Sequence, residues 1–148
     1  MELWELTARE EIRESLARYA HYADTGRFVE LVGLFTAEGV LEIDGRPPLQ
    51  GRAAIEAFLT ATKTNIAANL TQPLIRHHVS SLRIDVHGPD TASAASYFLA
   101  LTERGPDHWG RYRDRLVRVR EQWLVQHRRV RRDGYAPNSW VATRRETP

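Results

Sequence analysis

The sequence predicts an α+β fold in which helices pack against one face of a sheet. Apolar residues recur at helical spacing through the first half of the chain, whereas long consecutive strand patterns fill the second half. The length of 148 residues suits one core, so we expect a single domain over residues 1–148. A composition of 42% hydrophobic and 27% charged residues is typical of globular proteins.

The first half of the chain carries three helical patterns. Thr7 and Glu10 fit a capping box, and the pattern that follows ends at Asp24, before the break at Thr25-Gly26. A second, shorter pattern comes next, and Gly51 precedes the third. The helices are expected over residues 7–24, 28–35 and 52–66, with a short strand over residues 40–43.

The second half of the chain predicts four long strands. His87 to Asp90 contains Gly and Pro and is expected to form a turn, and residues 104–110 are expected to form a loop. The four strands are expected over residues 75–86, 91–103, 111–120 and 123–132. Helices that come first and antiparallel strands that follow are typical of helices packed on one face of a sheet.

Several kinds of chemistry are excluded by residue usage. The chain has no cysteine, which excludes disulfides, thiolate metal sites and cysteine nucleophiles. Its six histidines are scattered without ligand spacing, and neither a Gly-x-Ser-x-Gly elbow nor a phosphate-binding glycine loop occurs. We therefore expect no metal and no cofactor.

Charge and hydropathy limit the partners and the compartment. Lys63 is the only lysine, and acidic residues are interspersed among the many arginines of the C-terminal third, so we expect a solvated sheet face and no nucleic-acid partner. No apolar run is long enough to span a membrane. The N-terminal residues lack the basic and apolar regions of a signal peptide, which predicts a cytoplasmic protein.

Six local strings, in this order, resemble a known family. The strings are LARYAHYAD, LVGLF, GRAAIEAFL, IRHHVSSLRI, GRYRDRLVR and WLVQHRRV. Together they resemble the SnoaL-like branch of the nuclear-transport-factor-2-like superfamily, which includes polyketide cyclases, scytalone and bile-acid dehydratases and hexachlorocyclohexane dehydrochlorinase. The resemblance implies a cone-shaped, curved antiparallel or mixed sheet, with three N-terminal helices enclosing a pocket.

The resemblance also implies a set of catalytic residues. Asp24, in the string YAD, and His77, the first histidine of RHHVSS, match a dyad in which the imidazole is the base and the carboxylate orients it. Tyr19 and Arg128 match residues that stabilise a developing or departing anion. Because His78 and Arg129 are immediate neighbours of two of these residues, each remains an alternative to the residue before it.

Further residues are expected to contact the substrate. Strand alternation turns either Tyr112 and Asp114 or Arg111 and Arg113 toward the pocket. Tyr112 and Asp114 are expected to supply a hydrogen-bonding wall or a second acid, and the alternative is a cross-strand ladder of ion pairs on the solvent face. Phe35 and His78 are also expected to bind substrate.

These residues favour an enzyme that acts without a cofactor. The predicted function is a lyase or isomerase (a dehydratase, a dehydrohalogenase or a polyketide cyclase) acting on a small hydrophobic cyclic substrate. The alternatives are a non-catalytic assembly module, such as a small subunit of a ring-hydroxylating dioxygenase, and a pocket that only sequesters a ligand. A homodimer is expected, with a trimer as the alternative.

Overall fold

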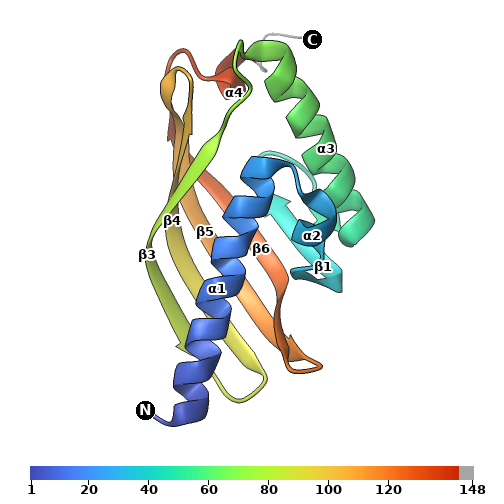
Figure 1. Cartoon of the computed structure of the whole chain (residues 1–148), viewed down its shortest axis with the longest axis vertical. Coiled ribbons are helices and arrows are strands. Elements are labelled where there is room, and N and C mark those ends of the chain that lie inside the picture. The colour runs from blue at the N-terminus through green and yellow to red at the C-terminus, as the bar shows by residue number, and fades with distance from the viewer. Residues whose placement is uncertain (144–148) are drawn as a thin grey trace.

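Helices and one curled sheet make up the computed structural model, which describes residues 1–143 (Figure 1). The last five residues of the predicted domain, 144–148, lie outside the described residues. The elements, in chain order, are α1 (Leu3–Thr25), α2 (Phe28–Val32), β1 (Phe35–Ile43), β2 (Leu49–Gln50), α3 (Arg52–Asn69), β3 (Arg76–Val86), β4 (Thr91–Thr102), β5 (Gly105–Val119), β6 (Gln122–Tyr135) and α4 (Trp140–Thr143).

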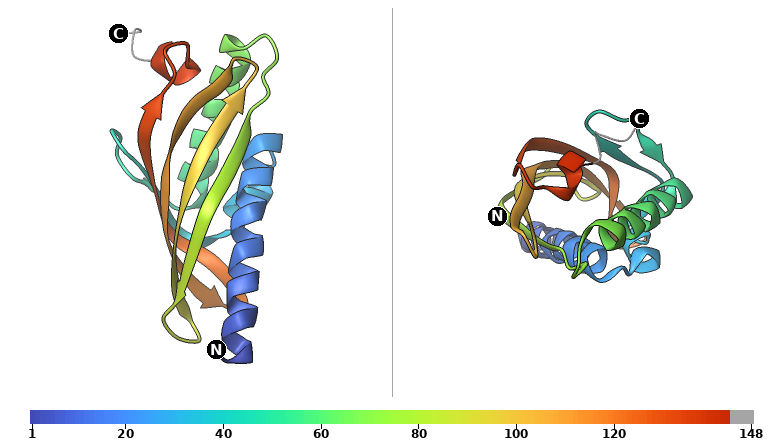
Figure 2. Two further views of the ribbon diagram at one scale, coloured as in Figure 1. Left: turned by 90° about the vertical axis from the view of Figure 1, so that its left-hand side faces the viewer. Right: turned by 90° about the horizontal axis from the view of Figure 1, so that it is seen from above.

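The sheet is mixed and follows the order β2-β1-β6-β5-β4-β3. Only β1 and β6 pair in parallel; the other neighbours described are antiparallel. Figure 2 shows that the sheet curls without closing, with α1 and α3 on its concave side. The predicted α+β cone is therefore confirmed, including the three N-terminal helices.

The packed core fills the end of the cone that holds the N-terminus. Ile12 and Leu16 of α1 are buried there with Leu116 of β5 and with Trp123 and Val125 of β6. Burying such side chains contributes about 1.5–3 kcal/mol each. A smaller cluster at the other end joins α3 to α4, with Ile66 and Trp140 among its members (Figure 1). None of the described helices is long and apolar enough to cross a membrane.

Two of the register shifts in the sheet decide which side chains of β3 and β6 face inward. In β3, the pairing register shifts between Ser80 and Arg83, and Ser81 has a positive φ of 53°. In β6, the shift lies beside Gln126, because Val125 pairs with Leu116 whereas His127 pairs with Arg115. An extra residue in one strand moves all later side chains to the other face.

The helix start differs from the prediction. α1 begins at Leu3, four residues before the predicted cap, and the hydroxyl of Thr7 donates to the carbonyl oxygen of Leu3 (3.0 Å). A Thr hydroxyl that bonds back one turn belongs to a helix interior, so the capping box does not form. The end of α1 was predicted well: Gly26 adopts the left-handed conformation, with a φ of 72°.

The strand boundaries also differ. Phe35 begins β1 instead of ending a helix, and the pairs of β1 with β6 account for the change. Residues 105–110, predicted as a loop, are the first part of β5 and pair with β4 and β6. α4 was not predicted.

Gly110 supplies a test of the sheet geometry. A Cβ at this position would overlap the carbonyl oxygen of Arg131 on the neighbouring strand. We expect Gly110→Ala to lower the free energy of unfolding by about 1–3 kcal/mol, because the backbone itself must move. Gly88→Ala is the matched control, since nothing lies within 4 Å of its added Cβ. Urea unfolding of both variants checks this, and equal stabilities would contradict it.

Candidate functional site

A cavity of about 910 Å³ occupies the end of the cone that carries α4. Its lining comes from the C-terminal end of α1, from α2, α3 and α4, from β1 and the loop that follows it, and from β3 to β6. Most of the lining is apolar or aromatic, and it also includes two histidines and six charged residues. Such a cavity is typical of a small-molecule site.

Asp24 and His77 meet at the wall of this cavity. The carboxylate of Asp24 accepts two hydrogen bonds from His77, one from the ring Nδ1 (2.6 Å) and one from the backbone N–H (2.9 Å). The side chains are 8% and 19% exposed, respectively. Because a carboxylate only accepts, Nδ1 carries the proton and Nε2 is left as the basic nitrogen.

The local fold explains how these residues meet. Gly26 ends α1 just after Asp24, and this helix end lies against the start of β3. His77 and Ile84 are seven positions apart, so regular alternation would place them on opposite faces of β3. The irregularity at Ser81 brings both to the inner face, and His77 lines the cavity whereas His78 is exposed.

A second carboxylate–imidazole pair, Asp107 and His108, lies across β4 from the first. The carboxylate of Asp107 accepts from Nδ1 of His108 (2.8 Å), from the Ser139 hydroxyl (2.7 Å) and from the backbone N–H of Trp140 (3.1 Å). Burial alone would raise the pKa of Asp107, but these hydrogen bonds outweigh it and lower the pKa. His108 lines the cavity, and Asp107 also holds the start of α4.

The two imidazoles lie close to each other. Their ring centroids are 6.4 Å apart, and Phe98 of β4 lies within ring-contact distance of both, 6.3 Å from His77 and 5.8 Å from His108. Each imidazole is oriented through Nδ1 by its own carboxylate. A bound molecule could therefore meet two acid–base groups at once.

A buried ion pair lies beneath the cavity. Nε and Nη2 of Arg128 donate to the two oxygens of Asp114, at 2.7 and 2.9 Å, and Arg128 is only 1% exposed. The rings of Tyr19 and Tyr112 flank the guanidinium, each with its centroid 4.1 Å from Cζ. Burial disfavours the charged arginine, yet the contact with Asp114 raises its pKa; burial also raises the pKa of both tyrosines.

The structure separates the predicted site residues into three groups. Asp24, His77, Tyr19 and Tyr112 line the cavity. Arg128, Asp114 and Phe35 are buried outside its lining, Phe35 in the packed core. His78 is exposed and lies outside the cavity lining, so this geometry does not fit the expectation that it binds substrate.

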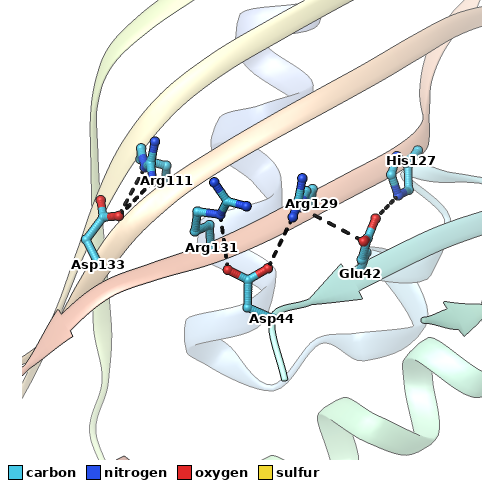
Figure 3. Close-up of polar contacts among 7 residues, drawn as sticks. All are labelled: Glu42, Asp44, Arg111, His127, Arg129, Arg131 and Asp133. Atoms are coloured by element: carbon cyan, nitrogen blue, oxygen red, sulfur yellow. Dashed lines mark hydrogen bonds and ion pairs between the residues drawn. The ribbon is translucent and has the colours of Figure 1, made fainter. Parts of the chain in front are cut away.

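The outer face of the sheet carries paired charges, which Figure 3 shows. Arg129 lies 3.6 Å from Asp44, Arg131 lies 3.2 Å from the same residue, and Arg111 lies 3.0 Å from Asp133. Arg129 therefore faces outward, and Arg128 is the inward arginine. A homodimer formed through this face would bury ion pairs and not an apolar patch.

The comparisons with known proteins give the family. Residues 4–129 match the family model described as a SnoaL-like domain. The chain belongs to the SnoaL-like family. No curated protein matches the sequence.

Solved structures share the fold of this SnoaL-like protein. A protein of unknown function from Mycobacterium tuberculosis is 26% identical, with 97% of this chain and 82% of that one covered and a TM-score of 0.75. A Catenulispora acidiphila protein, solved in complex with S-DNPA, is 29% identical over 86% and 95% of the two chains, with a TM-score of 0.73. A scytalone dehydratase-like protein from Novosphingobium aromaticivorans is 24% identical over 92% and 91%, with a TM-score of 0.78, and shows the fold alone.

Sequence reasoning missed the pair Asp107 and His108. Both fall in the segment predicted as a loop, which β5 includes. The alternation that turns Tyr112 and Asp114 inward reaches His108 when it is extended toward the start of β5. Among residues 1–143, no group of three or more His, Asp or Glu side chains is arranged to hold a metal ion.

The ion pair beneath the cavity predicts a large effect on stability. Asp114→Asn leaves the buried charge of Arg128 without its partner, and we expect a loss of about 3–5 kcal/mol in the free energy of unfolding. Asp133→Asn removes the partner of Arg111 on the exposed outer face and should cost less than about 1 kcal/mol. Urea unfolding measures both variants. Similar losses in the free energy of unfolding would contradict a larger contribution of the buried pair to stability.

Asp107 predicts a pH-dependent contribution to stability. Its pKa is lowered in the folded protein from an ordinary value of 3.8, so folding favours the ionised form, and the stabilisation is lost as the pH falls. We expect Asp107→Asn to cost about 1–3 kcal/mol at pH 7. The difference from the natural protein should shrink as the pH falls below 3.8. Unfolding titrations at several pH values measure it, and a difference that grows in acid would contradict the assignment.

Proposed function

We propose that this SnoaL-like protein is a cofactor-independent lyase or isomerase that removes a carbon-bound proton from a small hydrophobic cyclic substrate. The observation that carries the proposal is the double hydrogen bond from His77 to Asp24 at the wall of a largely apolar cavity. It orients one imidazole and leaves Nε2 as a base where a substrate would lie. General bases of this kind contribute about 10²- to 10⁴-fold in rate.

The proton transfer follows from the pair. Nε2 of His77 takes the proton from a carbon next to an electron-withdrawing group, and the C–H electron pair stays on the substrate. The carboxylate of Asp24 then faces an imidazolium at 2.6 Å and stabilises its charge. The apolar lining strengthens this interaction, because little water competes for the charges.

His108 gives the reaction a second proton carrier. In an elimination, the electron pair forms a carbon–carbon double bond while the leaving group departs with the Nε2 proton of His108, which must start as the imidazolium because its Nδ1–H is held by Asp107. In an isomerisation, the proton returns at another carbon of the conjugated system. Asp107 orients His108 in either case, through its contact with Nδ1.

The comparisons support this class of function without naming the reaction. The SnoaL-like family model covers most of the chain. A scytalone dehydratase-like protein shares the fold, and the Catenulispora relative was solved in complex with S-DNPA. A cavity that binds a small molecule is the feature that these relatives support.

The Kemp elimination of nitrobenzisoxazole tests the base. In this reaction a base removes the ring C–H proton, the N–O bond breaks, and a coloured nitrophenolate forms. We expect the protein to accelerate the reaction above free imidazole at equal concentration and pH. His77→Gln should lower the rate by about 10²-fold or more, and Asp24→Asn should also lower it strongly.

The adjacent histidine supplies the control. His78 is exposed outside the cavity lining, so His78→Gln should keep the rate of the natural protein. Full activity in His77→Gln, or loss of activity in His78→Gln, would overturn the assignment of the base. Binding of the probe without acceleration would favour a cavity that only sequesters its ligand.

A further inference from the structure

The cavity lining has an uneven distribution of charge. Its basic residues are Arg46, Lys63 and Arg132, and its carboxylates are Asp24, Asp44 and Asp133. Each carboxylate has a partner: Asp24 is held by His77, Asp44 by Arg129 and Arg131, and Asp133 by Arg111. Figure 3 shows the last two carboxylates beside arginines of the outer sheet face.

The three cations have no such partners. Among residues 1–143, none of Arg46, Lys63 and Arg132 makes an ion pair. Arg46 stacks on Phe58 with Cζ 4.6 Å from the ring centroid, and Arg132 stacks on Tyr135 at 5.4 Å. Stacking on an aromatic ring holds a guanidinium in place without neutralising it.

Lys63 is placed by a different contact. Its ammonium lies against Gly26 at the end of α1, where an added Cβ would come within 2.8 Å of Nζ. Gly26 is two residues from Asp24, so the only lysine of the chain lies at the helix end that carries the first dyad. The lining therefore combines an apolar interior with three cations that make no ion pair, of which Arg46 and Lys63 are exposed and Arg132 is half-buried.

We infer that the ligand of this cavity is an amphipathic anion: a hydrophobic ring system that fills the interior and an acidic group, such as a carboxylate, that binds Lys63, Arg46 and Arg132. The inference deepens the proposed function by naming the charge of the substrate, and it rests on the cavity being the substrate site. Charge-assisted contacts of this kind are stronger and shorter than neutral hydrogen bonds. They would also fix which end of the molecule reaches His77.

Two fluorescent probes with the same aromatic body test the inference without any turnover. Anilinonaphthalene sulfonate carries a negative charge, and phenylnaphthylamine is its neutral counterpart. We expect both to bind the natural protein, and added salt should weaken only the sulfonate. Each single substitution, Lys63→Gln, Arg46→Gln or Arg132→Gln, should weaken the sulfonate about 2- to 5-fold, and the triple variant should weaken it about tenfold or more.

The control is a second triple variant with the same loss of charge. Arg113→Gln, Arg118→Gln and Arg120→Gln change exposed arginines outside the cavity lining. This variant should bind both probes as the natural protein does, and near-ultraviolet circular dichroism confirms that each variant is folded.

Three results would overturn the inference: equal weakening of both probes in the cavity variant, equal weakening of the sulfonate in the two triple variants, or no probe binding to the natural protein. The first would leave an apolar cavity with no charge preference, and the second would mean only a general attraction to a basic protein. Loss of Kemp activity in His77→Gln with no charge preference would retain the proposed base and reject the anionic substrate alone.

Discussion

The buried pair of Arg128 and Asp114 divides the interior of the cone into two parts. Toward the N-terminal end, the concave faces of β5 and β6 carry Leu116 and Val125 and are packed solid. Beyond the pair they carry His108 and Val130, which line the cavity. Desolvating two charges is costly, and it is offset here by two direct hydrogen bonds and two flanking tyrosine rings. The pair places charged groups directly beneath the cavity, where apolar side chains would otherwise extend the core.

Each of the two histidines of the cavity is oriented by a carboxylate, but the two carboxylates lie in different parts of the chain. His77 is oriented by a carboxylate at the end of a helix, and that carboxylate also accepts from its backbone N–H. His108 is oriented by its neighbour in the sequence, Asp107, which also accepts from Ser139 and Trp140. The second imidazole is therefore linked to the start of α4, which lines the cavity, whereas the first is linked to α1. A change in the position of α4 would act on one imidazole and leave the other in place.

Helical spacing and long strand patterns were sufficient for the α+β class, whereas the family resemblance supplied the cone and the pairing of Asp24 with His77. The sequence did not decide which of two neighbouring residues faces inward, either between His77 and His78 or between Arg128 and Arg129. Both choices depend on strand irregularities, at Ser81 and beside Gln126, that reverse the alternation counted from the buried ends of the strands. A register shift of one residue leaves no reliable mark in composition or periodicity. The pair of Asp107 and His108 was missed because β5 begins with Gly105 and Pro106, which are typical of a loop.

The arginines of the chain occupy two different environments, which the sequence alone could not distinguish. On the outer sheet face, Arg111, Arg129 and Arg131 are matched by carboxylates, so their charge is compensated locally and contributes little to stability. Around the cavity, the carboxylates Asp44 and Asp133 are already engaged by those same arginines. The lining has as many carboxylates as cations, and the net charge of the chain is only +2. The availability of Arg46, Lys63 and Arg132 for an anion therefore depends on the outer ion pairs that engage Asp44 and Asp133, and not on an excess of basic residues.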